Sequence, residues 1–268
     1  MIELAPQHKT GLVIDRPIMP AAGFWGYGPP AYANIFNATL FGALVTNPIT
    51  LRPRPHQAPP LALETNGGVL LTTPPRNPGA RRVINGYSKF WRRAATPVIA
   101  HLPADDPADL ARTAGALAGL NLLAGIELGL PRGARPQDAR DTIQAIQQRS
   151  ELPLLVRLPL ENLPALSEAA LDCGADALVI GAVPHGAGYT EHGDYQTGDY
   201  YGPGVVPQFL PYLADLRRRH PAVPLIVAGG VHTSADVRAY LTAGATAVQL
   251  DTLIFTNPAQ VQQILTHL

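Results

Sequence analysis

The sequence predicts a single (β/α)₈ barrel extending over residues 1–268. Eight short apolar runs alternate with longer segments of helical periodicity, an order that favours a parallel sheet covered by helices. The runs are apolar along most of their length, as strands buried on both faces are. None is followed directly by GxGxxG, which argues against an open dinucleotide-binding sheet. The chain also has about the usual length of one closed barrel.

Each expected strand is a β-branched, apolar run bounded by glycine, proline or polar residues. RPIMPAAG is the first, and its carboxyl end lies near Gly23. The fifth, LPLLVRL, contains a single charged residue, Arg157. The eight runs occupy residues 16–23, 42–51, 96–102, 124–130, 152–158, 176–182, 223–230 and 246–252.

Five segments have helical periodicity and residues suited to helix ends. They occupy residues 106–120, 136–149, 162–174, 234–245 and 257–268. Asp106 is the expected N-cap of the first of these, with Pro107 at its first helical position. The other expected boundary residues are the N-caps Asn162 and Ser234 and the helix stops Gly174 and Gly244.

Three segments lie outside this alternation of strands and helices. Residues 2–14, IELAPQHKTGLVI, are expected to form a short hairpin that plugs the lower end of the barrel. Residues 47–82 are rich in proline and arginine, and residues 181–204 are rich in glycine, tyrosine and histidine. The last two segments follow strands, so they lie at the carboxyl face, where barrel enzymes keep their active sites.

Composition excludes several classes of function. The chain has 20 acidic and 20 basic residues, so it presents no basic footprint for nucleic acid or an anionic membrane. Cys173 is the only cysteine, which rules out an internal disulfide, a CxxC redox pair and a thiolate metal cluster. No apolar run is long enough to span a bilayer, and the cytoplasm is the expected location.

Four stretches resemble class 1 dihydroorotate dehydrogenases, in the same order along the chain. They are PIMPAAGFWGYG, GALVTNPITLRPRPHQAPPLALETNGGVLLTTPPRNPG, YYGPGVVP and PLIVAGGVHTSADVRAYLTAGATAVQLDTLIFTNP. The resemblance implies a barrel that holds FMN at its carboxyl face with a substrate ring stacked on the flavin. It also implies a loop base that takes a proton while hydride passes to the flavin.

The resemblance also assigns ligand-binding positions. It implies that Gly229–Gly230, Thr252 and Gly202 lie around the FMN phosphate, and that Gly23 lies in the first loop of the flavin site. Arg157 stands where the family has a lysine beside the flavin. The residues expected on the substrate side of this mouth are Asn77, which the family shares, and His185 in the polar loop.

Several family residues are replaced in this chain. Asp251 stands where the phosphate turn has a glycine, and its charge would repel a phosphate. The motif ELNLSCPN, which carries a substrate asparagine and the catalytic cysteine or serine, here reads ELGLPRGARP. Without the base and these hydrogen-bonding groups, we expect standard dihydroorotate oxidation to be lost. The remaining replacements are Asn47 for a flavin-site lysine, Ala22 for a serine, Leu71 for an asparagine, and Gly181-Ala182 for Asn-Thr or Asn-Ser.

Two classes of function remain open: a flavin-dependent oxidoreductase with an altered substrate, and a non-catalytic barrel that binds a ligand or serves as a scaffold subunit. His185 or His192 could supply a replacement acid/base group, and His101 points toward the same mouth. A metal site from His185, His192 and Asp194 has no standard ligand spacing, and the prediction is that no metal is bound. A tyrosine-rich surface loop that orders itself, or forms a homo-oligomer contact, is slightly favoured over catalysis. Arg157 has a structural alternative too, a buried ion pair with Glu127.

Overall fold

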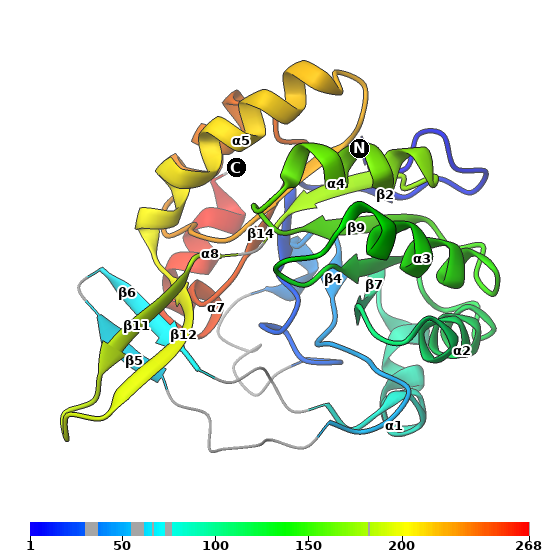
Figure 1. Ribbon diagram of the computed structural model, residues 1–268, viewed down its shortest axis with the longest axis horizontal. Helices are drawn as coiled ribbons and strands as arrows, with labels where there is room; N and C mark the ends of the chain where they lie inside the picture. Colours follow the sequence, from blue (N-terminus) through cyan, green and yellow to red (C-terminus); the bar gives the residue numbers. More distant parts are fainter. Residues whose placement is uncertain (30–36, 55–61, 66, 73–76, 182, 268) are drawn as a thin grey trace.

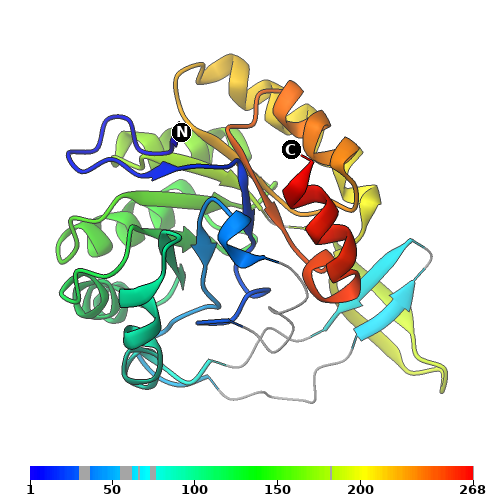
Figure 2. The same ribbon diagram turned by 180° about the vertical axis from the view of Figure 1, so that it is seen from behind.

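The computed structural model describes residues 1–29, 37–54, 62–65, 67–72, 77–181 and 183–267. An eight-stranded parallel sheet forms a nearly closed barrel with helices around it, which confirms the predicted (β/α)₈ fold (Figures 1 and 2). Its hydrogen-bonded order is β3-β14-β13-β10-β9-β8-β7-β4. The strands are β3 (Ile18–Pro20), β4 (Leu44–Val45), β7 (Val98–Pro103), β8 (Gly125–Gly129), β9 (Leu154–Leu158), β10 (Ala177–Ile180), β13 (Leu225–Ala228) and β14 (Ala247–Leu250).

A backbone hydrogen bond joins the two end strands of this sheet. The Gly42 N–H donates to the Ile18 carbonyl over 2.8 Å, just before β4 begins. Only glycine fits there, because a Cβ on Gly42 would lie 2.0 Å from the Arg16 carbonyl oxygen. This close approach brings β3 beside β4 and closes the circle of strands.

The helices follow the strands in the order expected for such a barrel. Three of them, α1 (Ala80–Arg93), α5 (Val206–Arg219) and α7 (Leu253–Thr256), were not among the helices expected from the sequence. α1 and α5 are rich in arginine, α5 contains Pro211, and α7 has only four residues. The helices are α1 (Ala80–Arg93), α2 (Pro107–Ala118), α3 (Pro136–Gln147), α4 (Leu163–Asp172), α5 (Val206–Arg219), α6 (Ser234–Thr242), α7 (Leu253–Thr256) and α8 (Pro258–Thr266).

The helix boundaries confirm some of the expected caps and correct one. Asp106 caps α2, accepting from the N–H groups of Ala108 and Asp109. Asn162 occupies the N-cap position of α4 as expected, but its φ of 59° places it in the left-handed region and its side chain makes no cap hydrogen bond. The expectation for Ser234 is wrong, because Thr233 accepts from the Asp236 N–H in a capping box. The stops at Gly174 and Gly244 are confirmed by their positive φ.

The lower end of the barrel is filled by the amino-terminal hairpin, as predicted. Strands β1 (Ile2–Glu3) and β2 (Val13–Ile14) pair antiparallel. Leu4 and Ile14 are buried against inward-facing residues of the barrel strands, among them Met19. The core at this end is therefore wholly apolar.

The two segments that interrupt the alternation come together in a second sheet. Strands β11 (His185–Tyr189), β12 (Tyr195–Tyr201), β6 (Gly68–Leu71) and β5 (Ala62–Thr65) form an antiparallel sheet in that order. β12 pairs with β6, for example Tyr200 with Leu70. Figure 1 shows this sheet projecting from one side of the barrel. The expectation of two loops is thus corrected, since strand pairing between distant segments supplies their backbone partners.

Candidate functional site at the barrel mouth

Four polar side chains converge inside the carboxyl half of the barrel, each from a different strand. Glu127 of β8 is fully buried, and the other three side chains all contact its carboxylate. His101 Nδ1 of β7 lies 2.9 Å from Glu127 Oε1, and Arg157 Nη1 of β9 lies 3.7 Å from the same oxygen. Gln249 of β14 donates Nε2–H to Glu127 Oε2 over 2.6 Å. The ion pair expected between Arg157 and Glu127 is confirmed.

Glu127 remains ionised in this surrounding. Burial alone would raise its pKa, but the hydrogen bond and charge of His101, the charge of Arg157 and the Gln249 hydrogen bond together hold the pKa below its usual range. A buried carboxylate of this kind is stable only while its partners stay in place. Glu127 therefore sets the positions of its neighbours.

Two glycines make room for the large side chains of this cluster. A Cβ on Gly129 would lie 2.7 Å from His101 Cε1 and 3.0 Å from His101 Nε2. A Cβ on Gly181 would lie 2.3 Å from Arg157 Nε, and Arg157 Nε and Nη2 both donate to the Gly181 carbonyl oxygen, over 3.0 and 2.6 Å. Both glycines stand where the resembling family has asparagine. The sequence comparison shows the loss of the amides, and the structure shows that His101 and Arg157 occupy the space.

The Gly-Gly turn after β13 is closed by a carboxylate of the same chain. Gly229 and Gly230 both have positive φ, 126° and 80°. The Gly230 N–H donates to Asp251 Oδ2 over 2.9 Å, and the Gly229 N–H donates to the Gln249 carbonyl over 3.2 Å. Thr252 Oγ1 donates to Asp251 Oδ1 over 3.2 Å. The backbone donors of this turn therefore already have acceptors.

Burial raises the pKa of Asp251, although the hydrogen bond from Gly230 and the nearby His232 act in the opposite direction. The surrounding turn is tightly packed as well. A Cβ on Gly230 would lie 2.9 Å from Val205 Cβ, and one on Gly202 would lie 2.5 Å from the Gly67 carbonyl oxygen. Of the predicted cofactor positions, Gly229, Gly230 and Thr252 thus lie against Asp251, whereas Gly202 packs against Gly67 and Tyr200.

The first loop is attached to β4 by Asn47. Its Oδ1 accepts from the Gly26 N–H over 3.0 Å, and its backbone N–H donates to the Gly26 carbonyl over 2.8 Å. Gly23, in the same loop, has a φ of 95°. Asn47 therefore acts on the backbone here, in the position where the family has a lysine.

An aromatic cluster lies beside the mouth. Phe24 contacts Tyr201 edge-on with ring centroids 5.1 Å apart and stacks on Phe255 at 5.9 Å. These rings come from the first loop, the end of β12 and α7, so three distant segments form one apolar wall.

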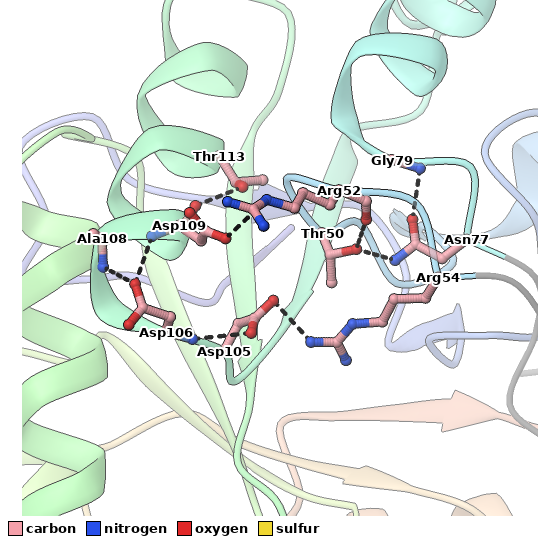
Figure 3. A network of polar contacts seen from close by, with 10 residues as sticks. All are labelled: Thr50, Arg52, Arg54, Asn77, Gly79, Asp105, Asp106, Ala108, Asp109 and Thr113. Atoms are coloured by element: carbon pink, nitrogen blue, oxygen red, sulfur yellow. Dashed lines mark hydrogen bonds and ion pairs between the residues drawn. The ribbon is translucent and has the colours of Figure 1, made fainter.

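Asn77, expected on the substrate side, has its amide engaged in local structure (Figure 3). Its Nδ2 donates to Thr50 Oγ1 over 2.8 Å, and its Oδ1 accepts from the Gly79 N–H over 3.0 Å. Arg54 pairs with Asp105 of the β7–α2 loop at 2.8 Å and forms a backbone bridge with Asn77. These contacts connect the segment after β4 to the start of α1, and the proposed substrate role of Asn77 stays a prediction.

The expected acid/base residues of the polar loop lie on the second sheet. His185 is exposed, and its Nδ1 is 3.4 Å from Asp199 Oδ1, which also accepts from Arg132 over 2.8 Å. His192 is exposed at the β11–β12 turn. Within the described residues no three His, Cys, Asp or Glu side chains are grouped to hold a metal ion. From sequence, His101 was expected only to point toward the mouth; the structure places it in the buried polar cluster around Glu127.

Fold and sequence together place this chain among the (β/α)₈ barrels related to dehydrogenases. A sequence profile of the dihydroorotate dehydrogenase family matches residues 6–268, and the chain belongs to this family. The catalytic subunit of dihydroorotate dehydrogenase B (NAD(+)) from Pelobacter propionicus is 30% identical, with 95% of this chain and 89% of that protein covered. The same subunit from Bacillus mycoides is 28% identical, with 92% and 85% covered.

A solved structure agrees with this relationship. The fold superposes on dihydroorotate dehydrogenase from Eimeria tenella, solved in complex with ferulenol, with a TM-score of 0.78. The identity is 16%, and the match covers 95% of this chain and 82% of that one, so it shows the shared fold. Within the described ranges, no helix has the length and apolar composition needed to cross a membrane.

The phosphate end of an FMN does not fit the cradle as it stands. The one amide of the Gly-Gly turn that faces away from the sheet already donates to Asp251, and this carboxylate would lie against the phosphate. A phosphate is anionic, and a buried site screens its repulsion from an ionised Asp251 carboxylate poorly.

Proposed function

We propose that this chain is a dihydroorotate dehydrogenase family barrel that has lost dihydroorotate oxidation and now binds a different small molecule at its mouth. The observation that carries the proposal is the paired filling of Gly129 and Gly181 by His101 and Arg157. Where the family has substrate-binding asparagines, this chain has Gly129 and Gly181, and the side chains of His101 and Arg157 occupy the space. The loop from residue 130 to 136 contains no cysteine, serine or threonine that could act as a nucleophile or base. A site built this way selects different hydrogen-bond partners.

A turnover assay tests the loss of the family reaction. Purified protein is supplied with dihydroorotate and a range of acceptors, including NAD, quinones and a redox dye, in buffer with added FMN. We expect a rate no higher than that of buffer alone, while a Pelobacter propionicus catalytic subunit assayed in parallel reports that the mixture supports turnover. A robust rate from this chain would refute the proposal.

FMN is the first ligand to test because of the family relationship. We propose that the wild-type chain purifies without visible flavin bands and binds FMN weakly, because Asp251 occupies the phosphate cradle. Asp251→Gly restores the family residue and frees the Gly230 N–H, so it should raise FMN affinity at least tenfold in a fluorescence titration. Asp251→Asn is the matched control, since it removes the charge but retains the side chain in the cradle, and should give a smaller gain.

The remaining expected positions belong to this proposal. Arg157 and Gly23 would border the ring of a flavin in the Asp251→Gly variant, with Gly202, Gly229, Gly230 and Thr252 around its phosphate. Asn77 and His185 would lie on the substrate side. If wild type binds FMN as tightly as Asp251→Gly, or if neither binds it, these assignments are wrong.

A second candidate is a binding or scaffold subunit. The second sheet favours it, because Tyr189 and Tyr195 are exposed at 67% and 60% and contact each other at its outer end. Tyrosines of this kind suit a protein contact, including one between copies of this chain, for which we propose a cytoplasmic location. Light scattering of wild type and of Tyr189→Ser/Tyr195→Ser tests this: the same monomeric mass for both argues against a homo-oligomer.

We further propose that residues 1–268 unfold as one domain, in a single calorimetric transition.

A further inference from the structure

His101 is held in the orientation that proton transfer requires. Its Nδ1 faces Glu127, its direct partner in the β7–β8 register. Its Nε2 and Cε1 lie next to Gly129, two residues further along β8 toward the mouth. The ring therefore points its second nitrogen from the buried carboxylate toward the carboxyl face.

The two nitrogens consequently have different roles. An ionised Glu127 can only accept a hydrogen bond, so Nδ1–H donates to it and Nε2 is the nitrogen left to exchange a proton with a bound molecule. In the part of the chain that the structure describes, Nε2 has no hydrogen-bond partner. An imidazole oriented by a buried carboxylate with its other nitrogen free is the arrangement of a general base.

Two neighbours suggest what the base would act on. Arg157 and His101 both contact Glu127 Oε1, so one small molecule could contact the guanidinium and the imidazole together. The Arg157 side chain is 15% exposed. Gln249 Oε1 is fully buried and has no hydrogen-bond partner within the described residues. A buried acceptor of this kind calls for a bound molecule to complete it.

We infer that His101 is the acid/base residue of a small-molecule site whose ligands are carbonyl compounds able to form an enolate. The C–H bond next to the carbonyl breaks, its proton goes to His101 Nε2, and its electron pair moves onto the carbonyl oxygen beside Arg157. Return of the proton completes the cycle, so no oxidant or reductant is consumed. Glu127 is a positioning residue that holds the tautomer. The inference rests on the proposed function, because the mouth must be free of a bound flavin.

Reaction with diethyl pyrocarbonate, read by peptide mass spectrometry, tests whether Nε2 is an open, unprotonated nitrogen. We expect His101 to be modified in the native protein, on a time scale within about tenfold of the exposed His192. Glu127→Gln should reduce the modification of His101 severalfold and leave that of His192 unchanged. If His101 stays unmodified while His192 reacts, the ring belongs to a sealed structural pair and the inference is overturned.

Oxalate, a stable planar mimic of an enolate, tests the ligand class. Millimolar oxalate should protect His101 from the reagent at least fivefold, without protecting His192, and Arg157→Gln should abolish the protection. Absence of protection in the wild type overturns the assignment of carbonyl compounds. Should Glu127→Gln unfold, ¹⁵N-histidine spectra of the wild type give the tautomer directly, and a proton on Nε2 at neutral pH would contradict the role. None of these measurements depends on dihydroorotate turnover or FMN binding, so the proposed function can fail separately.

Discussion

The two ends of the barrel are filled in opposite ways. At the lower end the amino-terminal hairpin places Leu4 and Ile14 against apolar strand residues. At the mouth His101 and Glu127 are register partners, Arg157 lies beside Gly129 two residues nearer the carboxyl end, and one carboxylate connects all three side chains. Apolar filling depends on volume alone, whereas polar filling also requires that every charge keep its partner. The mouth can therefore change its chemistry only by coordinated substitutions.

The largest expected effect is at the mouth. Glu127→Ala leaves Arg157 and His101 facing a cavity without their common acceptor, and removing one partner of a buried ion pair costs about 3–5 kcal/mol. Urea unfolding measures this. If Glu127→Ala lowers the free energy of unfolding by less than about 1 kcal/mol, the charges at the mouth are solvated. The two ends of the barrel would then not differ in how strongly a buried residue depends on a charged partner.

A substitution at the apolar end provides the comparison. Ile14→Ala removes a side chain that is 1% exposed within the lower core and should cost about 2–5 kcal/mol through lost burial and the remaining cavity. This loss should vary less with pH than that of Glu127→Ala, because Ile14 packs into a cluster of apolar side chains. Stability measured across pH in the two variants separates the two kinds of filling.

Gly129→Ala tests the space made for His101. The new Cβ would lie 2.7 Å from the ring, so His101 or β8 must shift, at a cost of roughly 1–3 kcal/mol. In a His101→Ala background the same change should cost much less, because the clash is gone. Additive effects in this double-mutant cycle would show that the two positions are independent.

The next effect, a few degrees in Tm, depends on pH. Because burial raises the pKa of Asp251, the folded protein holds this proton more tightly than the unfolded chain does. The stability due to this group is complete below its unfolded-state pKa of about 3.9 and is lost as pH rises through the folded-state pKa. Asp251→Asn cannot ionise, so its Tm should exceed that of the wild type near neutral pH and converge with it in acid. A constant difference across pH would contradict this.

The smallest effect is expected at the rim. Arg54→Ala breaks the ion pair with Asp105, but the Arg54 side chain is 52% exposed, and pairs of this kind contribute about 0–1 kcal/mol. Raising the salt concentration should remove most of the difference from the wild type. A large, salt-independent loss would mean that the network in Figure 3 behaves like the buried cluster.

Local pattern was sufficient for much of this molecule. Runs such as LPLLVRL and VPLIVAGG predicted buried parallel strands because their apolar character is continuous, and the hairpin that plugs the barrel was expected from residues 2–14. The loss of the family's base and amides could also be read directly, since absent residue types need no coordinates. Helices α1, α5 and α7 were not predicted; α1 and α5 carry several arginines, α5 contains Pro211, and α7 is a single turn of four residues.

The sequence by itself determined the order of strands and helices and the end of the barrel where the candidate site lies. It also showed which catalytic and substrate-binding residues of the family are replaced in this chain. Only the tertiary structure decided that His101 and Arg157 fill the space above Gly129 and Gly181, and that Asp251 turns onto the Gly230 amide. It also decided that β12 pairs with β6, more than a hundred residues earlier in the chain. The physical reason is that these contacts join residues on separate strands, and their energies depend on distances that no local pattern contains.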